Sequence, residues 1–320
     1  MGSNLTKQKK QIALVLGSGG ARGLAHIGVI KALEENRIPI DIITGTSIGA
    51  FIGGLYASGV SIKEMEKIVA EVDKVFVAKI LVPKFFAPGL INNKRVVEFI
   101  KGMVGDIKIE NLKIPFASVA TDLITGEEVV FKKGSLADAI MASIAIPTIF
   151  QPVQINNRYL LDGGLSNPLP ISVALEMKAQ KIIVVNVSPN PKRITGKIKK
   201  RKTEEFKSLI KTLPEMFSNM LNNNLRLSAG IDKTTKKKSA VETEVYSPTL
   251  LNVFLQSIAI STNSLIEQRL LHSKPDILIL PKIEDYDMLE FYKGKEIIKR
   301  GYDEAVKSMI SIHEIIVRQT

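Results

Sequence analysis

The sequence predicts an α/β protein whose mainly parallel sheet is covered by helices on both faces. Three observations lead to this fold class. Short apolar runs of strand length are followed by helical patterns, and this alternation is typical of parallel sheets. Glycines stand where the first two apolar runs pass into the helices that follow them. Hydrophobic residues make up 45% of the 320 residues, so the chain can bury the core that such a sheet requires.

The expected elements alternate most regularly near the N-terminus. Ile12–Leu16 predicts a buried strand, and a helical pattern from Ala21 to Glu35 follows it. Ile40–Thr44 predicts the second strand, and Ile48–Ser58 the second helix. The later candidates are strands at Phe116–Thr121, Glu128–Phe131, Tyr159–Leu161, Ile182–Val187 and Ile277–Leu280, and helices at Leu136–Ser143, Leu250–Leu271 and Lys295–Val317.

Residue types that are absent or rare exclude several kinds of site. The chain has no cysteine, which excludes a disulfide scaffold, cysteine-ligated zinc, an iron–sulfur cluster and a cysteine nucleophile. Three histidines, His26, His272 and His313, are too few for a multi-histidine metal site. We therefore expect no metal and no cofactor.

The stretch from Ile42 to Ile62 carries no charge and is long enough to span a bilayer. Its five glycines and several hydroxyl side chains instead indicate a buried strand, a turn and a tightly packed helix. The apolar run Ile12–Leu16 is too short for a signal peptide. We expect a cytoplasmic protein that can touch the inner membrane face peripherally.

One segment, Lys192–Lys238, holds fourteen basic and four acidic residues and so carries most of the net charge of +12. Within it, apolar residues at helical spacing run from Phe206 to Leu221, interrupted by Pro214. This pattern suits either a core helix between solvated linkers or an element that lies on anionic lipid. We expect residues 1–320 to form a single domain, with residues 189–248 as a basic amphipathic insertion. Nucleic acid is not an expected partner, because the basic run Lys197–Lys202 is short and has no interleaved aromatic residues.

The first motif is a glycine-rich loop, Gly17-Ser18-Gly19-Gly20-Ala21-Arg22-Gly23, between the first strand and helix. Backbone N–H groups at a helix N-terminus can bind a phosphate or stabilise an oxyanion. The loop does not match a dinucleotide-binding fingerprint, because Arg22 stands where a glycine or alanine is required. It does not match a P-loop either, because no Gly-Lys-Ser/Thr follows.

The second motif, Gly45-Thr46-Ser47-Ile48-Gly49, also joins a strand to a helix. It has the nucleophile-elbow pattern in its expected context, although Gly-x-Ser-x-Gly also occurs as a plain turn. A nucleophilic serine needs a base. The histidines are poor candidates, since His26 is expected to pack or cap in its helix, His272 to interact with a helix C-terminus, and His313 lies near the chain end.

The third motif, Tyr159-Leu160-Leu161-Asp162-Gly163-Gly164, places a carboxylate at the end of an apolar strand. An Asp-Gly pair often marks an ordinary turn. At a strand end, however, Asp162 could meet Ser47, and burial would raise its pKa from about 3.9 and make it a better base. A Ser47–Asp162–His272 triad, in the usual chain order of esterases, stays open at this point.

These three motifs, in this order, resemble the patatin-like phospholipase family. The stretches Gly23–Val29, Ala120–Glu127, Ala142–Pro147 and Leu165–Pro170 are also typical of its bacterial members. The resemblance runs from about Ile12 to Val187, resumes near Leu250, and is weakest over Ser188–Pro248.

The resemblance implies a three-layer α/β/α sandwich around a mostly parallel central sheet, and a metal-independent serine acyl hydrolase. The substrate would be a lipid ester: phospholipid, lysophospholipid or glyceride. Ser47 would attack the ester and Asp162 would accept its proton. The remaining implied roles are an oxyanion hole at Gly19, Gly20, Ala21 and Arg22, and motif-supporting glycines at Gly17, Gly45, Gly49, Gly163 and Gly164. The alternative is an adaptor or regulatory protein that keeps the fold and acts through its basic segment.

Overall fold

The computed structural model describes residues 11–73, 93–188 and 250–317. The described residues up to Ser188 and from Ile258 onward belong to one compact unit, and Leu250–Ser257 belong to a second. The predicted insertion at residues 189–248 lies outside the described residues, so its structure stays a prediction.

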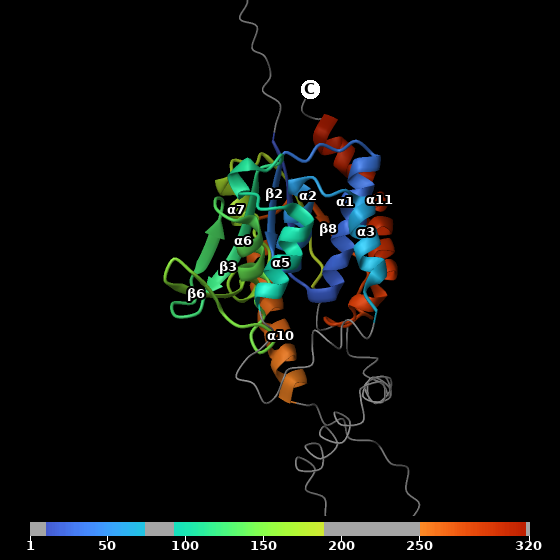
Figure 1. The fold of residues 1–320 in the computed structure, drawn as a ribbon. Coiled ribbons are helices and arrows are strands. Elements are labelled where there is room, and N and C mark those ends of the chain that lie inside the picture. Colours follow the sequence, from blue (N-terminus) through green and yellow to red (C-terminus); the bar gives the residue numbers. More distant parts are fainter. Residues whose placement is uncertain (1–10, 74–92, 189–249, 318–320) are drawn as a thin grey trace, which may run out of the picture. The chain divides into compact units, whose positions relative to one another are not determined.

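A single eight-stranded sheet forms the centre of the first unit (Figure 1). Its order is β5-β6-β3-β2-β1-β7-β8, and β4 pairs with β3 off this path. Pairing is parallel from β3 through β2, β1 and β7 to β8, whereas β4, β5 and β6 are antiparallel to their neighbours. The strands are β1 (Ile12–Leu16), β2 (Ile42–Thr46), β3 (Phe116–Asp122), β4 (Glu128–Phe131), β5 (Val153–Ile155), β6 (Arg158–Asp162), β7 (Lys181–Val185) and β8 (Ile277–Ile279).

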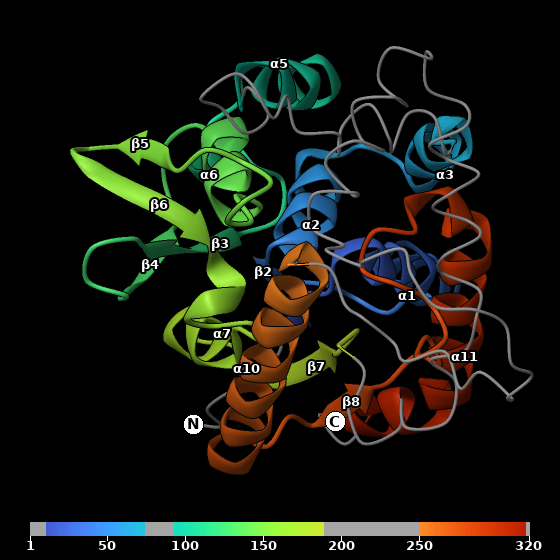
Figure 2. The ribbon, with the colours of Figure 1, turned by 90° about the horizontal axis from the view of Figure 1, so that it is seen from below.

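Helices cover both faces of this sheet, as the sequence predicts (Figures 1 and 2). In β1, Leu14 and Leu16 pack into the core under α1, α2, α3, α5, α6 and α11. The alternate residues Ala13 and Val15 pack on the opposite face against α7 and Ile266 of α10. The helices are α1 (Ala25–Glu35), α2 (Ile48–Ser58), α3 (Ile62–Glu71), α5 (Asn93–Val104), α6 (Leu136–Ser143), α7 (Ile171–Glu176), α10 (Leu250–His272) and α11 (Gly294–Val317). The layers therefore form an α/β/α sandwich.

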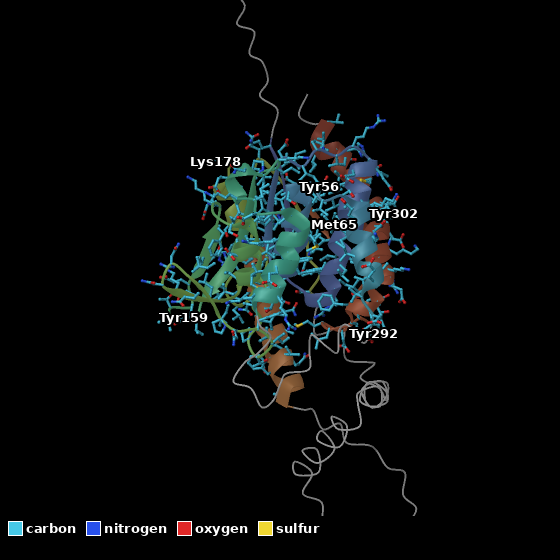
Figure 3. All side chains as sticks on the ribbon, viewed as in Figure 1. Tyr56, Met65, Tyr159, Lys178, Tyr292 and Tyr302 are labelled. Atoms are coloured by element: carbon cyan, nitrogen blue, oxygen red, sulfur yellow. The ribbon has the colours of Figure 1, made fainter. Side chains whose placement is uncertain are left out.

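Hydrogen bonds from two tyrosines hold the C-terminal end of α1. Tyr302 of α11 donates to Glu35 Oε2 at 2.6 Å, and Tyr56 of α2 donates to Glu34 Oε1 at 2.9 Å. Both tyrosines are labelled in Figure 3. Because α1 follows the glycine-rich loop, these bonds anchor the far end of the helix that the loop precedes.

Several boundaries differ from the sequence prediction. The second strand begins at Ile42, two residues later than expected, because just before it the Asp41 side chain accepts the Ile12 amide at 2.9 Å, a bond that regular strand pairing would give to a backbone carbonyl. The expected helix from Ala21 divides into a 3₁₀ turn, η1 (Gly20–Leu24), and α1. Strand β5 and helix α7 are too short to show a period in sequence.

The charge-free stretch from Ile42 forms β2 and α2, which confirms its interpretation as a strand, a turn and a packed helix. In the part of the chain that the structure describes, no helix combines the length and apolarity needed to cross a bilayer.

Helix α3 begins at a capping box in which Ser61 and Glu64 bond reciprocally. This start signal depends on polar residues rather than on the spacing of apolar ones.

Candidate active site

The register of the sheet brings the three motifs to one place. Parallel strands β1 and β2 end side by side, so the glycine-rich loop and the Ser47 elbow leave the sheet at the same edge. Thr46 pairs with Val119 of β3, and the next residue of β3, Ala120, pairs with Asp162. The antiparallel strand β6 therefore ends beside the elbow.

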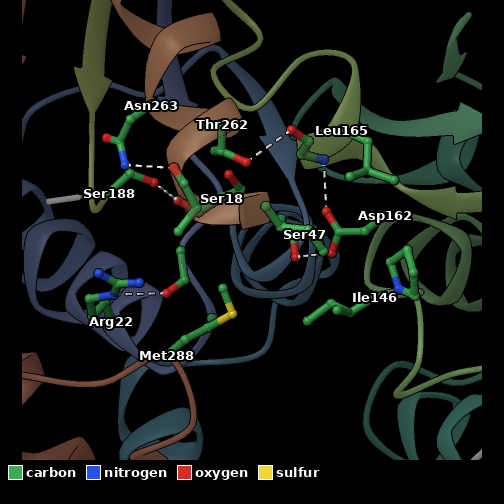
Figure 4. Close-up of a pocket in the computed structure, with 16 residues that line it drawn as sticks. Ser18, Arg22, Ser47, Ile146, Asp162, Leu165, Ser188, Thr262, Asn263 and Met288 are labelled. Carbon is green, nitrogen blue, oxygen red and sulfur yellow. Dashed lines mark hydrogen bonds between the residues drawn. The ribbon is translucent and has the colours of Figure 1, made fainter. Parts of the chain in front are cut away.

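Ser47 and Asp162 are in direct contact. Ser47 Oγ donates to Asp162 Oδ2 at 2.5 Å, and Asp162 Oδ1 accepts the Gly164 N–H at 2.7 Å (Figure 4). Both side chains are nearly buried, with exposed fractions of 5% and 7% for the two residues. A triad would need an imidazole between the two groups, and this contact leaves no place for one.

The elbow holds Ser47 in an unusual backbone conformation, with φ 56° and ψ −124°. Such a residue costs about 1–3 kcal/mol and persists only where its surroundings enforce it. Here the Ser47 N–H donates to Ser143 Oγ at 2.8 Å, and that hydroxyl donates to the Val119 carbonyl at 2.5 Å. A Cβ on Gly49 would collide with the Leu16 carbonyl, so only glycine fits there.

Burial raises the pKa of the Asp162 carboxyl to about 6, while the hydrogen bonds from Ser47 and Gly164 oppose the rise. This is the direction expected for a carboxylate at a buried strand end. Near neutral pH most of the carboxyl is still ionised, so it can accept a proton from Ser47, and it is a stronger base than an exposed aspartate.

Three successive carbonyl oxygens of the glycine-rich loop each accept a hydrogen bond from a different side chain. The pairs are His26 Nε2 with Gly17 O at 2.8 Å, Ser188 Oγ with Ser18 O at 2.9 Å, and Arg22 Nε with Gly19 O at 3.3 Å. Side chains thus hold the first three residues of the loop, two from outside the loop and one, Arg22, from within it.

His26 and Arg22, which both bond loop carbonyls, differ in charge. Burial lowers the pKa of His26 to about 4, so the ring is neutral and its Nε2–H donates to the Gly17 carbonyl. The sequence favours packing or capping for His26; the side chain is buried, and it also bonds the loop. Burial lowers the pKa of Arg22 to about 10, partly offset by attraction to Asp287, so Arg22 remains a cation.

The predicted oxyanion donors are not equivalent. The Ala21 N–H donates to the Met288 carbonyl at 2.8 Å and is therefore occupied. The amides of Gly19 and Gly20 donate to no residue that the structure describes. Gly20 has φ +59° and lies so close to the Met288 backbone that a Cβ would collide with it.

The other motif-supporting glycines fill places where a side chain has no room. A Cβ on any of them would lie within 3 Å of another atom; they are Gly17, Gly45, Gly163 and Gly164. Gly163, for example, packs against the Val119 carbonyl. Gly45 likewise packs against backbone atoms of the helix after the elbow, whereas Gly17 and Gly164 pack against side chains.

A small cavity of about 40 Å³ opens at the dyad and includes Ser18, Arg22 and Ser188 in its lining. Its apolar wall comes from Ile146, Leu165, Ile258 and Met288 (Figure 4). Helix α10 also contributes Thr262, whose hydroxyl lies 3.4 Å from the Gly164 carbonyl. Several residues at the site could not be found from the sequence, because they reach it only through tertiary packing. They are the residues of α10, Met288, Ser143 and Ser188.

The other histidines, and the Asp122 carboxylate at the end of β3, have other partners. His272 is exposed at the end of α10, where its Nδ1 lies 2.8 Å from the Gln268 carbonyl, as expected for a residue at a helix C-terminus. His313 makes the same kind of contact with Met309. The Asp122 carboxylate accepts the amides of Ile124 and Thr125 in a turn. Among the described residues, no group of three or more histidine and acidic side chains could hold a metal ion.

The part of the chain that carries the three motifs is similar to known proteins. The family model described as patatin-like phospholipase matches residues 14–175. An uncharacterized NTE family protein from Mycobacterium tuberculosis is 40% identical over 178 residues, which are 56% of this chain and 49% of that protein. Human patatin-like phospholipase domain-containing protein 6 is 36% identical over 181 residues, covering 55% of this chain and 13% of that protein.

The chain therefore spans about half the length of the mycobacterial relative and a much smaller share of the human one. Among solved structures, VipD from Legionella pneumophila aligns with a TM-score of 0.46 and 14% sequence identity, covering 95% of this chain and 67% of that chain.

Proposed function

The chain belongs to the patatin-like phospholipase family, and we propose that it is a serine acyl hydrolase that cleaves ester bonds of lipids through Ser47 and Asp162. The observation that carries this proposal is the 2.5 Å hydrogen bond from Ser47 Oγ to Asp162 Oδ2. A nucleophile in contact with a buried, ionised base is the minimum arrangement that acyl transfer requires.

In the acylation step, Ser47 Oγ attacks the ester carbonyl as its proton passes to Asp162 Oδ2. The carbonyl oxygen becomes an oxyanion. When the tetrahedral intermediate collapses, the bond to the alcohol breaks, and Asp162 returns the proton to the leaving oxygen. Ser47 then carries the acyl group.

In the deacylation step, a water molecule replaces the alcohol. Asp162 accepts a proton from this water, whose oxygen attacks the acyl carbonyl. Collapse of the second intermediate releases the fatty acid, and the proton returns to Ser47. The same carboxyl serves as base and acid in both steps, which suits a pKa of about 6.

We propose the amides of Gly19 and Gly20 as the oxyanion donors, because they make no other hydrogen bond to a described residue. Losing one such donor costs about 10²–10³ in rate in comparable enzymes. Arg22 adds positive charge nearby and holds the Gly19 carbonyl at 3.3 Å. The Ala21 amide, which the family resemblance suggests as a third donor, is bonded to Met288.

The proposed substrates are phospholipid, lysophospholipid or glyceride esters, presented at an anionic membrane surface. The basic segment Lys192–Lys238 supports the membrane proposal through its charge alone, since it lies outside the described residues. Each basic residue near such a surface contributes about 1 kcal/mol. High salt should therefore reduce hydrolysis of anionic vesicles and leave hydrolysis of a soluble ester unchanged; equal responses would contradict membrane docking.

The decisive experiment compares Ser47→Ala with the wild-type chain on a soluble short-chain aryl ester. We expect hydrolysis and labelling by an active-site phosphonate to disappear while the variant stays folded. Ser58→Ala is a matched control, because the Ser58 hydroxyl bonds the Leu55 carbonyl on the same helix, α2. Retained turnover in Ser47→Ala would contradict the assignment. A biological effect that survives without turnover would favour the adaptor alternative.

A further inference from the structure

We infer that Ser188 is a positioning residue for the oxyanion hole, acting through the Ser18 carbonyl on the direction of the Gly19 amide. The inference rests on the proposed function, in which the Gly19 amide is a donor to the reacting carbonyl. Ser188 follows β7, lines the cavity at the dyad, and donates its hydroxyl proton to Ser18 O at 2.9 Å.

Peptide geometry connects this hydrogen bond to the neighbouring amide. In a trans peptide, the C=O of one residue and the N–H of the next point in opposite directions. Ser188 bonds the carbonyl of the Ser18–Gly19 peptide, so the Gly19 N–H points away from Ser188. Glycine can adopt a wide range of backbone angles, so we expect loss of the bond to let this peptide plane change its direction.

The amides on either side show why this peptide depends on a side chain. The Ser18 N–H is held by the Pro168 carbonyl at 2.9 Å and the Ala21 N–H by the Met288 carbonyl at 2.8 Å. The amides of Gly19 and Gly20 lie between these two anchors and make no bond to a described residue. Their orientation is therefore set through the carbonyls that precede them, by Ser188 and Arg22 respectively.

Ser188 is itself fixed by the sheet. Its own N–H donates to Asn186 Oδ1 at 3.0 Å, and the Asn186 N–H donates to the Ile279 carbonyl of β8 at 3.1 Å. Val187 lies so close to Gly19 that a Cβ on Gly19 would collide with it. The Ser188 hydroxyl thus fixes the loop relative to strands β7 and β8.

The test measures kcat and KM of Ser188→Ala on a soluble ester and on the matching thionoester, whose sulfur accepts hydrogen bonds poorly. We expect kcat on the ester to fall about 10- to 50-fold, a part of the 10²–10³ that loss of a whole donor costs, with KM unchanged within twofold. The ratio of the ester rate to the thionoester rate should fall as well, because the thionoester sulfur gains little stabilisation from the Gly19 amide. Ser188→Thr should restore kcat and the ratio.

Ser58→Ala is again the control, since its partly exposed hydroxyl also donates to a backbone carbonyl and lies outside the site. If Ser188→Ala does not fold, Ser188→Cys, which keeps the volume and weakens the hydrogen bond, should show a reduced ratio. An unchanged ratio in the folded variants overturns the inference, even where kcat falls. If Ser47→Ala retains hydrolysis, the proposed function fails first; if hydrolysis depends on Ser47 but the ratio is indifferent to Ser188, only this inference fails.

Discussion

The amide of Ala21 donates to the carbonyl of Met288 at 2.8 Å, joining the glycine-rich loop to a segment 267 positions later in the chain. The contact has two consequences. It occupies an amide that the family resemblance suggests as an oxyanion donor, and it brings the Met288 backbone against Gly20 so closely that no side chain fits. The loop therefore has its shape only when the C-terminal part of the described chain is packed against it.

Gly20→Ala should damage this loop. A Cβ there would meet the Met288 carbonyl, and φ is +59°. We expect kcat to fall at least about 100-fold, as for a lost oxyanion donor, and the melting temperature to drop. Gly126→Ala is the control, because Gly126 also has positive φ, +73°, but open space around it. That variant should lose only about 1–2 kcal/mol of stability and keep its activity. Wild-type kcat in Gly20→Ala would contradict the packing argument.

The pH dependence of hydrolysis should follow Asp162. Its pKa of about 6 predicts that kcat/KM is level above pH 7 and falls about tenfold for each unit below 6. Asp122→Asn should leave the profile unchanged, since backbone N–H bonds from Thr125 and Ile124 lower the pKa of Asp122. A profile that stays level down to pH 4.5 would show that another group is the base.

Asp162→Asn should abolish turnover and stabilise the fold at pH 8. A carboxyl whose pKa is raised from 3.8 to about 6 on folding makes the folded state bind more protons between those values. Its stabilising effect is present below pH 4 and is lost as the pH rises through 6. Removing the charge should therefore add about 2–3 kcal/mol at pH 8 and little at pH 4. Urea unfolding at both pH values measures the difference, and equal gains would contradict it.

His26 has the opposite effect on stability, because its pKa falls from 6.5 to about 4 on folding. Stability from the neutral ring is lost as the pH falls from 6.5 towards 4. In the wild-type chain the two effects oppose each other, so the Asp162→Asn variant should show a steeper loss of stability in acid than the wild-type chain.

Ser143→Ala should reduce both stability and activity. Its buried hydroxyl accepts the Ser47 N–H and donates to the Val119 carbonyl. Loss of both bonds should cost about 2–3 kcal/mol and let the Ser47 backbone relax, which lowers kcat. Ser118→Ala is the control, since that buried hydroxyl makes one bond, to the Ala139 carbonyl at 3.2 Å. It should cost about 1 kcal/mol and leave kcat within twofold.

Much of the fold follows from local pattern. Strands β1 and β4 and helix α2 have the bounds that the sequence predicts. A buried strand or helix face needs apolar residues at regular spacing, and this spacing can be read from the sequence. Elements of three to six residues, β5 and α7, have too few positions to show a period. The helical pattern from Ala21 includes a 3₁₀ turn, because the glycine-rich loop bonds Met288 before α1 begins.

By itself, the sequence determined the alternation of strands and helices near the N-terminus, the glycines of the three motifs, and Ser47 and Asp162 as candidates for nucleophile and base. Those features depend on neighbouring residues and on motif spacing. Tertiary structure alone decided that β6 runs antiparallel and ends beside the elbow, that Ala21 bonds Met288, and that Ser143 and Ser188 hold the catalytic backbone. The hydrogen bonds of Ser143, Ser188 and Met288 to the catalytic backbone join segments from 96 to 267 positions apart. No local pattern encodes them, because any hydroxyl or carbonyl could serve until packing selects one.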